Sequence, residues 1–148
     1  MKLLQCLCFL SIAALPLTAA SQPSDDPYGA PDPAIDLPLE GEALTEIFID
    51  RTHRGYYEVG DWDDADPAFS EVMNADGTTL HVRDGISSAG RWQTRSNVVC
   101  FTYDDLSGGC FNIYQRGNCY YALSAYDKAL VAITVMDGDT PDCEPSYA

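Results

Sequence analysis

The stretch VVCFTYDDLSGGCFNIYQRGNCYYALS, residues 98–124, decides the fold of this chain. Runs rich in Val, Phe, Tyr and Ile are separated in it by SGG at 107–109 and RGN at 116–118. β-branched and aromatic residues favour strands, whereas Gly, Asn and Ser favour the turns between them. The stretch therefore predicts consecutive antiparallel strands joined by tight turns.

The same pattern continues on both sides of this stretch, with further turn signals such as Asp76-Gly77 and Asp137-Gly138. Short strands at roughly ten-residue spacing favour an antiparallel meander that forms a small barrel or a half-open sheet. We therefore expect a mainly β fold with one short amino-terminal helix. The expected strands, about eight in number, are 52–59, 69–74, 79–83, 90–95, 98–103, 110–115, 119–124 and 130–136.

Alternation within these runs predicts which side chains face the core. Strands this short enclose a narrow interior that side chains fill, so a large ligand cavity is not expected. Three sets of residues are each expected to mark a buried face: Leu80 with Val82; Val99 with Phe101 and Tyr103; and Val131 with Ile133 and Val135.

The amino-terminal residues have the layout of a secretory signal peptide. Lys2 precedes an apolar run from Leu3 to Leu15, and small residues follow at 18–21. The run is about thirteen residues long, shorter than the roughly twenty that span a bilayer as a helix. We expect residues 1–20 to be removed and the mature protein to be periplasmic or secreted, without a membrane span.

Three segments follow the expected cleavage point. Residues 21–38, SQPSDDPYGAPDPAIDLP, contain few bulky apolar side chains, which predicts a flexible lead rich in Pro and Asp. Apolar residues at helical spacing then predict a short helix near 39–49. Residues 39–148 are expected to form a single disulfide-bonded β domain.

An even number of cysteines in an exported chain indicates disulfides, and the spacing includes no C-x-x-C of a zinc site. Four cysteines allow three pairings. A hairpin turning about Asp105 would place Cys100 opposite Cys110, which favours that pair and leaves Cys119 for Cys143. The six cysteines are Cys6 and Cys8 in the expected signal peptide and Cys100, Cys110, Cys119 and Cys143 after it.

The chain is strongly acidic, with 23 Asp and Glu against eight Lys and Arg and a formal net charge of -15. Such a field repels nucleic acid and anionic lipid surfaces and attracts cationic partners, a basic protein among them. It also keeps an exported protein in solution. No nucleic-acid partner is expected.

No pattern assigns a catalytic residue or a cofactor. His53 and His81 belong to no recognisable motif and are interpreted as ordinary surface or sheet residues, and GISSAG at 85–90 lacks the G-x-S-x-G spacing of a nucleophile elbow. An acidic loop offers weak metal candidates but lacks the Gly and Glu of a calcium-binding EF-hand, so a solvated loop is expected there. Its carboxylates are Asp61, Asp63, Asp64 and Asp66; the loop with Asp137, Asp139 and Asp142 is equally ambiguous.

Four short segments together resemble small exported bacterial β proteins of unknown function: EVMNADG at 71–77, GRW at 90–92, VCFTY at 99–103 and CFNIY at 110–114. The resemblance covers about residues 44–121. In outline the architecture is also similar to lipocalin-like barrels and to periplasmic lysozyme inhibitors, a likeness of fold alone.

Three hypotheses of function follow. The leading one is a non-enzymatic periplasmic module that binds a ligand or partner. The alternative is an inhibitor of a basic enzyme such as lysozyme, which the acidic charge would suit. The third is a hydrolase with unrecognised carboxylates, although 23 acidic residues make a chance pair of carboxylates inevitable.

Overall fold

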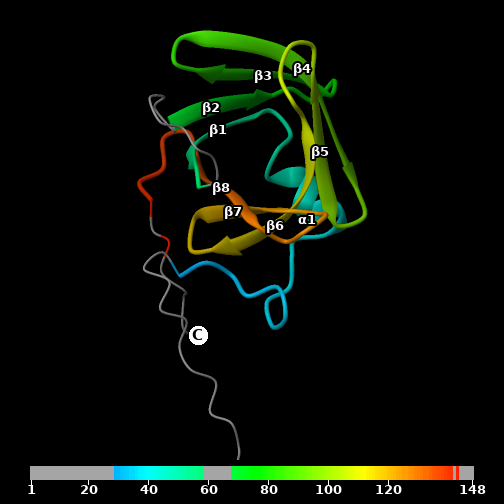
Figure 1. The fold of residues 1–148 in the computed structure, drawn as a ribbon, viewed down its shortest axis with the longest axis vertical. Helices are drawn as coiled ribbons and strands as arrows, with labels where there is room; N and C mark the ends of the chain where they lie inside the picture. Colours follow the sequence, from blue (N-terminus) through cyan, green and yellow to red (C-terminus); the bar gives the residue numbers. More distant parts are fainter. Residues whose placement is uncertain (1–28, 59–67, 142, 144–148) are drawn as a thin grey trace, which may run out of the picture.

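The structure is a computed structural model and describes residues 29–58, 68–141 and 143. Its strands form a closed barrel in which each strand is antiparallel to the next and β8 pairs back with β1 (Figure 1). The expected mainly β meander of eight strands with one short helix is confirmed, and the sheet is closed. The elements are α1 (Gly41–Glu46), β1 (Arg51–Tyr57), β2 (Ala68–Met73), β3 (Thr78–Arg83), β4 (Ile86–Arg95), β5 (Val98–Tyr103), β6 (Gly109–Arg116), β7 (Cys119–Ser124) and β8 (Leu130–Met136).

Tight turns hold neighbouring strands in register. Between β3 and β4, Asp84 and Gly85 have φ angles of 52° and 74°, and the flanking Arg83 and Ile86 are paired. Positive φ at both central positions is the geometry of a two-residue turn whose twist matches that of the strands. Asp and Gly tolerate this conformation, which explains why the dipeptide stands here.

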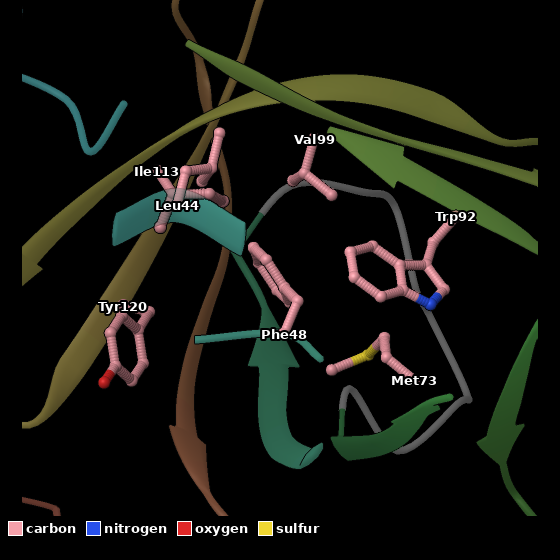
Figure 2. Packing of buried hydrophobic residues seen from close by; sticks show 7 residues of the cluster. All are labelled: Leu44, Phe48, Met73, Trp92, Val99, Ile113 and Tyr120. Carbon is pink, nitrogen blue, oxygen red and sulfur yellow. The ribbon is translucent and has the colours of Figure 1, made fainter. Parts of the chain in front are cut away.

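One end of the barrel is sealed by α1 and the turn after it. Leu44 and Phe48 point into the barrel and pack on side chains from several strands (Figure 2). Burying these apolar side chains stabilises the end by about 1.5 to 3 kcal/mol per residue. The buried cluster contains Leu44, Phe48, Met73, Trp92, Val99, Ile113 and Tyr120.

The helix is shorter than the expected 39–49. Phe48 and Ile49 both donate their backbone N–H groups to the carbonyl of Thr45, and Asp50 has a φ of 53°. These bonds tighten the chain into a turn, and the left-handed residue then redirects it into β1.

The expected inward faces are right for β5 and wrong for β3. Leu80 is 39% exposed, whereas Thr79 and His81 are buried at 4% and 3% exposure. The polar set of β3 therefore faces the interior, where it finds hydrogen-bond partners. In β8, Ile133 and Val135 are buried as expected, but their cluster with Tyr121 lies on the opposite side of the sheet from the lumen-facing Ala132.

Two disulfides join the cysteines in the pairing that the hairpin register predicts. Cys100 bonds to Cys110 directly across β5 and β6, and Cys119 bonds to Cys143 in the tail. The second bridge joins residues 24 apart, against 10 for the first. In the chain-entropy model, the longer loop gives the larger stabilisation.

Replacing the tail cysteine tests this contribution. Cys143→Ser should lower the free energy of unfolding by about 2 to 5 kcal/mol, because the unfolded chain regains the freedom that the bridge removes. Chemical denaturation measures the change, and Asp139→Ser, at an exposed tail position, is the control. An unchanged denaturation midpoint in Cys143→Ser would show that the bridge does not stabilise the fold.

Candidate functional site

The barrel encloses a cavity of about 980 Å³. Its lining runs from Phe48 and Met73, at the end sealed by α1, to Arg83, Leu106 and Tyr126 at the opposite end, where the loops after β3, β5 and β7 lie. The volume is at the upper end of the range typical of small-molecule sites. The expectation that side chains fill the interior is therefore wrong.

Small side chains on one wall account for the cavity. Gly109, Ala122, Ser124, Ala132 and Thr134 all line it, and they come from β6, β7 and β8. An eight-stranded barrel has room inside either for side chains or for one small ligand. Because the residues at these positions are small, the barrel has room for a small ligand.

Aromatic side chains form another wall. The Tyr57 and Phe69 rings are stacked with centroids 4.5 Å apart, and the His81 ring lies 5.3 Å from Phe69 and 5.7 Å from Tyr103. Phe101 continues the row, 6.3 Å from Tyr103. Such a row of rings offers flat apolar surface to a ligand in the cavity.

A buried carboxylate lies at the centre of this wall. Glu71 accepts a hydrogen bond from the Thr79 hydroxyl at one oxygen, and its other oxygen lies 2.7 Å from His81 Nδ1 and 2.9 Å from the Tyr103 hydroxyl. Glu71 and His81 are directly paired across β2 and β3. Three partners from two other strands thus compensate the cost of burying this carboxylate.

The tyrosines of this wall remain protonated at neutral pH. Burial, and then the nearby Glu71 carboxylate, raise the pKa of Tyr57 to about 12. The pKa of Tyr103 is raised in the same way, first by burial and then by Glu71. The Tyr103 hydroxyl therefore keeps the proton that it donates to Glu71.

The second buried histidine is a neutral structural group. His53 Nε2 lies 2.8 Å from the Ile47 carbonyl oxygen, so it carries the proton, and Nδ1 accepts from the Thr134 hydroxyl at 3.0 Å. Burial lowers the pKa of His53 below its usual value near 6.5. Both ring nitrogens are occupied, and the ring links β1 to β8 and to the turn after α1.

The mouth of the cavity combines one cation with exposed apolar residues. The Arg83 guanidinium lies 5.7 Å from the Tyr57 ring centroid, and its Nε is 3.5 Å from Asp84. Three apolar residues at this end are exposed: Ile86, the first residue of β4; Leu106, in the loop after β5; and Tyr126, in the loop after β7, which is 97% exposed. These side chains give the mouth an exposed apolar rim beside the Arg83 guanidinium.

The two acidic loops lie only in part within the described residues. Asp61, Asp63, Asp64 and Asp66 lie outside the described residues, as does Asp142, whereas Asp137 pairs with Arg54 at 2.7 Å. Within residues 29–58, 68–141 and 143, no group of His, Cys, Asp or Glu side chains is placed to hold a metal ion.

The interpretation of both histidines as ordinary surface or sheet residues missed their place in the lumen. Glu71 and Tyr103 were missed as site residues as well. The sequence of β3 did contain one signal. Thr79 and His81 alternate there with Leu80 and Val82, so the two polar residues share one face, which was a candidate for the inward face.

Comparison with known proteins gave no match: no family model fits the chain, and no curated protein or solved structure is similar to it. None of the described helices has the length and apolar character that crossing a membrane would require.

The neutral state of His53 predicts a pH dependence of stability. Because its pKa is lowered in the folded state, the unfolded chain binds more protons near pH 6, and the free energy of unfolding should fall as pH drops below about 6.5. Urea denaturation across this range measures the slope, and His53→Gln should reduce it. A His53 imidazole that titrates at or above pH 6.5 in the folded protein, followed by NMR, would contradict the assignment.

Proposed function

We propose that this chain is an exported binding protein that holds one small, largely apolar molecule inside its barrel. The observation that carries the proposal is the cavity of about 980 Å³, which is bounded by the α1 plug at one end and by an apolar rim at the other. Clefts of this size, lined by aromatic residues and a few fixed polar groups, are the usual sites for small ligands.

The polar groups of the cavity support binding in preference to hydrolysis. A glycoside hydrolase needs carboxyl groups free to act on the substrate, whereas Glu71 already accepts bonds from Thr79, His81 and Tyr103. A network satisfied in this way fixes side-chain positions without supplying a reactive carboxylate.

Export is supported by the signal-like amino terminus and by the two disulfides. Disulfides persist in oxidising compartments and are rare in the cytosol. A periplasmic or secreted protein with an internal cavity would capture or carry a molecule that dissolves poorly in water.

Titration with N-phenylnaphthylamine, an uncharged dye that fluoresces in apolar surroundings, tests the proposal. We expect saturable binding of one dye per protein. Ala122→Phe should weaken it at least about tenfold, because Ala122 lines the cavity and a phenyl ring there occupies the space of the dye.

Ala89→Phe is the matched control, since Ala89 is exposed on β4 and does not line the cavity. It should bind the dye like the parent. No saturable binding by the parent, or equal binding by both Phe variants when both are folded by circular dichroism, would refute a ligand site in the lumen.

A further inference from the structure

The cavity holds two buried polar side chains with unused hydrogen-bonding capacity. His81 is 3% exposed and Ser88 is 7% exposed, and both line the cavity. They face each other directly across β3 and β4. Paired side chains on one face of a sheet lie close enough to contact the same small group.

The free atom of His81 is Nε2. Its Nδ1 is engaged by Glu71 at 2.7 Å, and no hydrogen bond within the described residues uses Nε2 or the Ser88 hydroxyl. Within the described residues, every fully buried side-chain nitrogen or oxygen has a hydrogen-bond partner. Nε2 and the Ser88 oxygen must therefore reach the open space of the cavity.

The Glu71 contact determines what Nε2 can offer. A carboxylate accepts, so the Nδ1 proton points to Glu71, and in this tautomer Nε2 presents a lone pair. The Ser88 hydroxyl beside it can donate. An acceptor and a donor that converge in this way match a ligand hydroxyl group, which donates to the first and accepts from the second.

The surroundings favour a ring next to that hydroxyl. His81 lies among the rings of Tyr57, Phe69 and Tyr103, at centroid distances between 5.3 and 6.0 Å. A ligand carboxylate would meet the negative field of Glu71, and a ligand without a hydroxyl would leave two buried polar atoms unpaired.

We propose that the cavity selects uncharged ring compounds that carry a hydroxyl group, which His81 Nε2 and the Ser88 hydroxyl bind together. This inference rests on the proposed function, because it assigns the ligand class of the same site. His81 would act as the acceptor, and Glu71 would be the positioning residue that holds its ring.

Three fluorescent compounds of one ring system test the inference: naphthol, methoxynaphthalene and naphthoic acid. The parent protein should bind naphthol on the order of tenfold more tightly than methoxynaphthalene, because only naphthol can donate to Nε2. Naphthoic acid should bind more weakly than naphthol. Equal binding of naphthol and methoxynaphthalene, or tighter binding of naphthoic acid, would overturn the inference.

Two substitutions test whether His81 and Ser88 cause the preference for naphthol over methoxynaphthalene. His81→Phe keeps a ring in place and should abolish it, and Ser88→Ala, a milder change, should reduce it about threefold. Ser87→Ala, at an exposed neighbouring position on β4, should leave it unchanged. An undiminished naphthol preference in folded Ser88→Ala would overturn the assignment.

The same titrations separate this inference from the proposed function. If the dye and methoxynaphthalene bind but naphthol gains nothing, the lumen is a ligand site and only the hydroxyl selection is wrong. If neither the dye nor any naphthalene binds, the proposed function fails, and this inference with it.

Discussion

Pairing of the first strand with the last is the constraint on which the rest of the structure depends. β1 pairs with β8 from His53 opposite Met136 to Tyr57 opposite Ala132, so the meander closes without a free strand edge. Closure of eight strands sets the width of the interior, which can hold either packed side chains or one small ligand. The size of each inward side chain then decides where the barrel is solid and where it is hollow.

The size of the inward side chains divides the interior along its length into a filled part and an open part. Near α1, Leu44, Phe48 and Trp92 fill the space and seal the end. Towards the other end, small residues such as Ala122 and Ala132 leave it open. The Glu71 network crosses the open region and links β2 to β3 and β5, skipping β4. The hydrogen bond to Glu71 holds the His81 ring in one orientation, as a binding site requires.

The parts of this fold that rest on local chemistry could be predicted from the sequence. Turn dipeptides such as Asp76-Gly77 located the hairpins, and the register about Asp105 brought Cys100 opposite Cys110. The helix was expected too long, because its end depends on the left-handed Asp50 and not on apolar spacing.

The candidate site depends on contacts between distant residues and was not predictable in the same way. Alternation in β3 separates Leu80 from His81 but does not say which face points inward. That choice was decided by Glu71 of β2, which accepts hydrogen bonds from Thr79 and His81, and by Tyr103 of β5, which donates to Glu71. The cavity likewise reflects small residues on separate strands, and no single segment of sequence shows that they share a wall.

The central claim is that the lumen of this barrel is a ligand site. Methyl NMR of the protein with and without N-phenylnaphthylamine tests it most directly, because the alanine methyl groups report on both sides of the sheet. Shift changes and intermolecular contacts at Ala122 and Ala132, with none at the exposed Ala89, are the predicted result. Changes confined to Ala89 and other outward methyl groups such as those of Leu80, with the lumen unaffected, would contradict it.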